Sequence, residues 1–129
     1  MSFSLDLSRF KDLTEKKMEQ AVKKTFIQLS TDIVRDTPVA SGRLRFNWFP
    51  AINKFSESQS DYTDKRIGSA IAKFTAKANQ YKLGDMITLS NNLPYAYDIE
   101  YGASKKKSPA GMVRINISRF NAMVKRNAK

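Results

Sequence analysis

The chain of 129 residues contains no cysteine and no histidine. Without them it cannot build the usual zinc sites, and it cannot pair a serine or cysteine nucleophile with a histidine base. Disulfide bonds are excluded for the same reason. We therefore expect no enzymatic activity and no cofactor. An enzyme of this composition would have to use carboxylates with a hard metal ion, or a catalytic lysine or tyrosine.

Long apolar runs are also missing. None approaches the roughly 18 residues that a membrane-spanning helix needs, and the first residues lack the basic flank and apolar block of a secretory signal. A chain of this length with 41% hydrophobic residues is expected to form a single domain over 1–129 with one core. We expect a soluble protein that is made in a cytoplasm and has no membrane partner.

Acidic residues are missing from the last quarter of the chain. Residues 1–100 carry 15 basic and 12 acidic side chains, whereas residues 101–129 carry 8 basic and none acidic, which gives a net charge of +11. A segment of one sign attracts polyanions or an acidic protein surface. A solvated tail that only keeps the protein soluble would carry the same charge, so both interpretations stay open.

The longest apolar pattern predicts an amphipathic helix over 8–36. Pro38 disfavours helical geometry at the preceding residue and is expected to end this helix. Ser8 could cap the start, or Asp12 and Glu15 could form a capping box. A helix of this length would extend about 43 Å.

A turn at Gly42 and a strand over 44–48 are predicted next. In this strand apolar residues alternate with Arg43 and Arg45, which places the two arginines on an outward face. Pro50 is expected to interrupt pairing or to confine the strand to an edge of its sheet.

The most polar and least periodic stretch, 56–64, is predicted to be a surface loop. Asp64 is expected to cap a helix with apolar positions from 67 to 81, which closes near Leu83-Gly84. A short β-favouring run over 86–90 predicts a second strand.

The patterns of the last third predict short elements: two helical turns over 95–101, a basic loop at 103–109, a strand over 113–117 and a terminal helix with Phe120, Met123 and Val124. The whole order predicts an α+β fold. A long N-terminal amphipathic helix and further helices are expected to pack on a small, mainly antiparallel sheet of three to four strands.

Four blocks of sequence carry a resemblance to a known family. They are, in order, Asp36-Thr37-Pro38-Val39-Ala40-Ser41-Gly42-Arg43-Leu44-Arg45, Asn92-Leu93-Pro94-Tyr95-Ala96, Glu100-Tyr101-Gly102 and Pro109-Ala110-Gly111-Met112-Val113-Arg114. In this order and spacing, and over most of the chain, they resemble the tail-completion or neck proteins of long-tailed bacteriophages.

The resemblance implies a structural virion protein without catalysis, assembled as a ring, usually sixfold, at the head–tail junction or the head-proximal end of the tail. Its partners would be copies of itself, other tail, neck or connector proteins, and packaged DNA through phosphate contacts. The positions that match the structural signature are Pro38, Gly42, Pro94, Tyr95, Ala96, Glu100, Tyr101, Gly102 and Gly111.

A ring component near packaged DNA gains from positive charge that faces its lumen, because phosphate contacts need no base specificity. Two other functions stay open: a nucleic-acid-binding module whose tyrosines stack on bases, and a metal-dependent nuclease that uses Asp98 and Glu100. The side chains that we expect to face DNA or a partner are Arg43, Arg45, Lys105, Lys106, Lys107 and Arg114.

Overall fold

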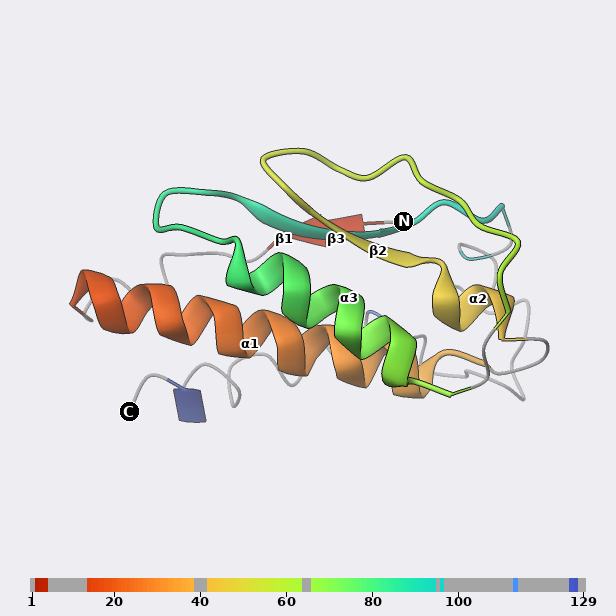
Figure 1. Cartoon of the computed structure of the whole chain (residues 1–129), viewed down its shortest axis with the longest axis horizontal. Coiled ribbons are helices and arrows are strands. Elements are labelled where there is room, and N and C mark those ends of the chain that lie inside the picture. The colour runs from red at the N-terminus through yellow and green to blue at the C-terminus, as the bar shows by residue number, and fades with distance from the viewer. Residues whose placement is uncertain are drawn as a thin grey trace.

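The computed structural model describes residues 2–4, 14–38, 42–63, 66–94, 96, 113 and 126–127. These residues form an α+β fold in which two helices cover one face of an antiparallel sheet (Figure 1). The fold class predicted from the sequence is therefore confirmed. The elements are β1 (Ser2–Ser4), α1 (Glu15–Asp36), α2 (Arg43–Phe46), β2 (Trp48–Ile52), α3 (Gly68–Asn79) and β3 (Ile87–Asn91).

The long helix α1 begins later than predicted. Thr14 is its N-cap, and the Thr14 hydroxyl accepts a hydrogen bond from the backbone N–H of Lys17 at 3.4 Å. The expected caps at Ser8 or at Asp12 with Glu15 are therefore wrong for this helix, because Thr14 already meets one of the unpaired N–H groups of its first turn. Its 22 residues extend roughly 33 Å instead of about 43 Å.

The end of α1 agrees with the prediction. Thr37 is the C-cap and has extended backbone angles, with φ −79° and ψ 129°. This is the conformation that a following proline imposes on its neighbour, and Pro38 is that proline. Gly42 has a φ of 85°, the left-handed region that glycine adopts readily in turns.

The strand predicted over 44–48 is wrong. The residues after Gly42 form the single helical turn α2, and only from Trp48 onward is the chain extended. Asn47 ends α2, because its side-chain amide donates to the Arg43 carbonyl at 2.8 Å. Three apolar residues at alternate positions are too few to distinguish one helical turn from a strand.

The sheet has the strand order β1-β3-β2, with both pairings antiparallel. β2 is thus an edge strand, as Pro50 predicted. In the β2–β3 register Pro50 lies opposite Leu89 and Ala51 opposite Thr88. The N–H of Asn53 donates to the Met86 carbonyl at 2.7 Å, which determines which alternate residues of β2 are hydrogen-bonded to β3.

Helix α3 also differs at its start. Its N-cap is Ile67, whose side chain makes no capping hydrogen bond, and not Asp64. The helix ends at Asn79, and Gly84 takes a φ of 99° in the turn before β3.

Strand β3 lies one residue later than the predicted 86–90. The loop predicted at 56–64 has no helix or strand over 56–63.

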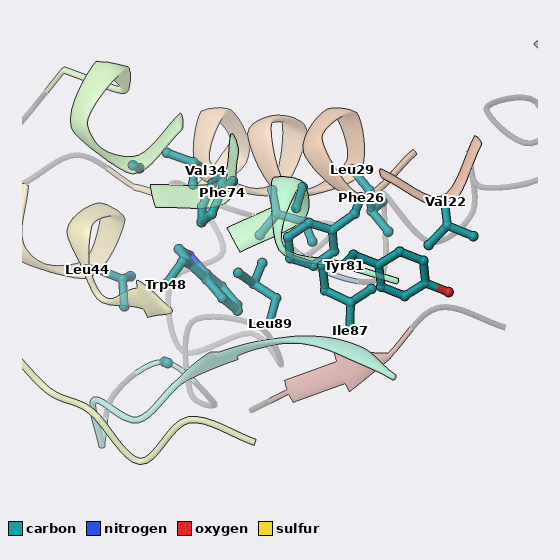
Figure 2. Packing of buried hydrophobic residues seen from close by; sticks show 14 of the residues in the cluster. Val22, Phe26, Leu29, Val34, Leu44, Trp48, Phe74, Tyr81, Ile87 and Leu89 are labelled. Atoms are coloured by element: carbon teal, nitrogen blue, oxygen red, sulfur yellow. The ribbon is translucent and has the colours of Figure 1, made fainter. Parts of the chain in front are cut away.

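The core lies between the two long helices and the sheet. Figure 2 shows Trp48, Ile87 and Leu89 directed from the strands toward the helices. Phe26 of α1 meets Phe74 of α3 edge to face, with 6.5 Å between ring centroids. Such aromatic pairs add about 0.5–1.5 kcal/mol to the stabilisation by burial.

Several predictions fall outside the described residues. They are most of the helical turns over 95–101, the basic loop at 103–109, most of the strand over 113–117 and the helical positions Phe120, Met123 and Val124. Val113 is described, and it is helical and packs against the core, so a strand is wrong at this position. Arg126 and Asn127 are helical, and both donate hydrogen bonds to the side chain of Gln28 on α1.

Candidate partner-binding groove

The loop that follows β2 lies over the face of the sheet opposite to the helices (Figure 1). The side chains of Thr88 and Asn92 hold it there by hydrogen bonds to its backbone carbonyls. The Thr88 hydroxyl donates to the Lys54 carbonyl at 2.6 Å, and the Asn92 amide donates to the carbonyls of Ser56 at 2.7 Å and Ser58 at 3.3 Å. The loop is therefore a fixed wall beside the sheet.

A second clamp holds the far end of this loop. The side chain of Asn47 is buried, and it donates to the Ser60 carbonyl at 2.9 Å while its oxygen accepts from the Ser60 N–H at 2.8 Å. This pair of bonds imitates a strand pairing. Asn47 thus binds both backbone groups of Ser60, and the Arg43 guanidinium adds a second donor to the Ser60 carbonyl at 3.3 Å, so the path of the loop depends on these two side chains.

A groove of about 760 Å³ lies between this loop, the edge strand β2 and helix α3. Helix α3 contributes residues at helical spacing, so they form one stripe along its surface. The lining residues that carry charge or an aromatic ring are Phe49, Lys54, Phe55, Glu57, Lys73 and Lys77.

Lys73 connects α3 to the edge of the sheet. Its ammonium nitrogen donates to the Phe46 carbonyl at 2.5 Å and lies 3.9 Å from the ring centroids of both Phe46 and Phe49. Burial lowers the pKa of Lys73 from 10.5 to about 8. The two ring faces and the carbonyl act in the other direction, because they favour the charged amine. Lys73 is thus mainly protonated at neutral pH.

The rest of the groove is accessible and carries an excess of positive charge. Phe55 is 49% exposed although its side chain is large and apolar. Lys54 and Lys77 make no ion pair with any carboxylate of the described residues. The groove is lined by three lysines and by one carboxylate, that of Glu57. Together with the exposed ring of Phe55, this lining suits an anionic partner that also carries apolar groups.

The predicted partner-facing arginines take part in contacts within the chain. The guanidinium of Arg45 donates to the carbonyls of Thr37 and Arg35, both at 3.1 Å, and so ties α2 to the end of α1. Arg43 donates to the Ser60 carbonyl at 3.3 Å and pairs with Asp61 at 3.1 Å. Neither lies on the outward face of a strand, since both belong to the helical turn α2.

The signature residues that the structure describes serve the scaffold. Pro38 follows the end of α1, Gly42 is the N-cap of α2, and Ala96 is buried in the core. Pro94 is exposed in a turn, across which the Ala96 N–H donates to the Leu93 carbonyl at 3.1 Å. The remaining candidates lie outside the described residues: Tyr95, Asp98, Glu100, Tyr101, Gly102, Lys105, Lys106, Lys107, Gly111 and Arg114.

Sequence reasoning missed the groove and its central residue Lys73. The available signal was the pair of aromatic residues at 46 and 49, which lysines on a neighbouring helix can cover.

Among the described residues no cluster of three or more acidic side chains could hold a metal ion. In the same part of the chain, no helix has the length and apolar character needed to cross a membrane.

Comparison of the chain with models of protein families, with curated proteins and with solved structures gives no match in any of the three.

Proposed function

We propose that this protein is a structural component of the particle of a long-tailed bacteriophage. It acts at the head–tail junction or at the head-proximal end of the tail, where it assembles as a ring, hexameric as in the family that the sequence resembles, and completes the tail or joins it to the head. In this role it binds copies of itself and neighbouring virion proteins, and performs no catalysis.

The observation that carries the proposal is the order of the four sequence blocks that resemble tail-completion and neck proteins. Two features of the fold support it. The first block runs from the last residue of α1 into α2, which directly precedes the edge strand β2. The second block begins with Asn92, whose amide fixes the loop over the sheet, and continues with Leu93, which is buried in the core.

The proposal also concerns the sheet β1-β3-β2. An edge strand can be extended by a neighbouring element or copy, so a fourth strand would be added in the whole chain or in the ring. Closed rings need two complementary faces on each copy. The excess charge of residues 101–129 would then face packaged DNA, where phosphate contacts are independent of sequence.

The decisive experiment deletes the gene from a phage that encodes this protein. We expect filled heads and separate tails in electron micrographs of the lysate, with joined particles restored by expression of the protein from a plasmid. Light scattering across concentration and negative-stain imaging of the purified protein should reveal a ring with a central hole. Joined, infectious particles from the deletion mutant would overturn the proposal.

A separate measurement addresses the DNA contact. Binding of the purified protein to double-stranded DNA should weaken uniformly with added salt and should not depend on the sequence of the DNA. Binding that keeps its strength in high salt and prefers one sequence would instead identify a specific DNA-binding protein.

A further inference from the structure

The floor of the groove is the outer edge of β2. The Asn53 N–H donates to the carbonyl of Met86, which directly precedes β3, so Phe49 and Ala51 direct their backbone groups toward β3 and those of Pro50 and Ile52 point away from it. Pro50 has no N–H, so what it offers here is a carbonyl oxygen. The edge can accept a hydrogen bond from an added chain, but it cannot form a full ladder.

The two walls place cations on both sides of this edge. Lys54 lies on the loop wall and Lys77 on the helix wall, while the ammonium group of Lys73 lies over the rings of Phe46 and Phe49. Phe55 adds an exposed apolar surface at the loop wall. Of the five residues of β2, Phe49, Pro50 and Ala51 line the groove. At about 3.4 Å each they give its floor a length of roughly 10 Å, which matches an extended segment of about three residues.

We propose that this groove binds an extended, acidic segment of a partner protein. Its carboxylates bind Lys54 and Lys77 on the two walls, one of its backbone N–H groups donates to the Pro50 carbonyl, and an apolar side chain packs on Phe55. This is addition of a chain to a sheet edge, in which backbone bonds give affinity and alternate side chains give specificity.

Charge complementarity favours this occupant over a second β2 strand from another copy. Two copies paired edge to edge would bring their lysines together, and would place two prolines where backbone donors are needed. A polynucleotide fits less well, because its sugar–phosphate backbone has no N–H for the Pro50 carbonyl and the Phe49 ring is already covered by Lys73. The inference does not depend on the virion role, since the groove lies within one copy of the chain.

The test uses a fluorescein-labelled peptide of alternating glutamate and valine as the probe, with fluorescence anisotropy as the readout. We expect saturable binding to the purified protein. The double variant Lys54→Glu/Lys77→Glu should weaken it by at least about tenfold, since two attractive contacts become repulsive. The control, Lys16→Glu/Lys24→Glu, makes the same two charge reversals at exposed lysines of α1 and should leave the dissociation constant nearly unchanged. Circular dichroism confirms that each variant is folded.

Three comparisons can overturn the inference. A peptide with glutamine in place of glutamate that binds equally well would remove the role of charge. Equal loss of binding in Lys16→Glu/Lys24→Glu would show attraction to the net charge of the chain rather than to the groove. An oligothymidylate that binds more tightly, with the same dependence on Lys54 and Lys77, would assign the groove to nucleic acid. Absence of peptide binding up to about 1 mM would also refute it.

Discussion

The indole N–H of Trp48 donates a hydrogen bond to the hydroxyl of Thr37 at 3.1 Å, and both residues are buried. The same hydroxyl donates to the Ile33 carbonyl at 2.7 Å. Thr37 ends α1 and Trp48 begins β2, so one oxygen atom connects the end of the long helix to the edge strand. The contact orients the edge of the sheet relative to the helices.

Thr37→Val tests this connection, because valine keeps the shape and removes the hydroxyl. We expect a loss of about 1–3 kcal/mol in the free energy of unfolding, since the buried indole N–H is left without a partner. Thr37→Ser is the matched control, which keeps the hydrogen bonds and removes one methyl group. Because the chain has one tryptophan, hydrogen exchange of its indole proton is a specific measurement. Exchange should be faster in the valine variant, and equal rates in the two variants would contradict the contact.

The lowered pKa of Lys73, about 8 against 10.5, predicts how stability depends on pH. Between these values the unfolded chain keeps a proton that the folded chain has released, so the free energy of unfolding should rise with pH from about 8 toward 10. Tyr81 acts in the opposite direction at higher pH, because its burial and then the charges of Asp85 and Glu19 raise its pKa. The measurement is urea unfolding across this range.

The contribution of Lys73 is isolated by Lys73→Met, which keeps the length of the side chain without its charge. The rise in stability between pH 8 and 10 should be smaller in this variant than in the wild type. A direct measurement of the lysine pKa by carbon NMR should give a value near 8. An identical pH dependence of the two proteins would show that Lys73 is not desolvated as described.

Asn47 and Asn92 hold the loop by side-chain amides, and each can be tested by replacement with alanine. Asn47→Ala leaves the Ser60 N–H without its partner and the Ser60 carbonyl with the Arg43 guanidinium as its remaining donor, so we expect a loss of about 1–3 kcal/mol and faster proteolysis within 56–63. Asn92→Ala should loosen the wall near Ser56 and weaken binding of the acidic peptide. Gln80→Ala, an exposed change on the opposite wall, is the control for cleavage of the loop.

Pro50 protects the outer edge of β2. Pro50→Thr supplies the missing N–H in a residue that favours strands, so we expect more self-association at the edge. Sedimentation velocity should detect species larger than those of the wild type. Pro94→Thr makes the same exchange at an exposed turn and should have no such effect. Equal profiles for wild type and Pro50→Thr would show that the edge is protected by other means.

The sequence predicted those elements whose pattern is long or whose ends carry a strong signal. The end of α1 could be predicted because Pro38 restricts Thr37 by local sterics alone. Its start could not, because Ser8, Asp12 and Thr14 can all cap a helix and lie within seven residues. Only the conformation of the chain decides which hydroxyl or carboxylate meets a free N–H.

The groove could not be predicted because it depends on contacts between distant segments. Lys73 looks like an ordinary solvated residue of a helix, and its position over Phe46 and Phe49 arises only when α3 packs beside β2. In the same way, the sequence placed Arg43 and Arg45 on a strand. Their actual partners are backbone carbonyls that the helical turn α2 brings within reach.

The wall formed by residues 54–58 is attached through main-chain oxygen atoms of Lys54, Ser56 and Ser58. Every amino acid supplies such an oxygen, so the attachment does not require the particular side chains that this wall presents to the groove. The residues at 55 and 57 can therefore be exchanged, by evolution or by design, to change the binding specificity of the groove. Thr88 and Asn92 would still hold the backbone of the wall in position.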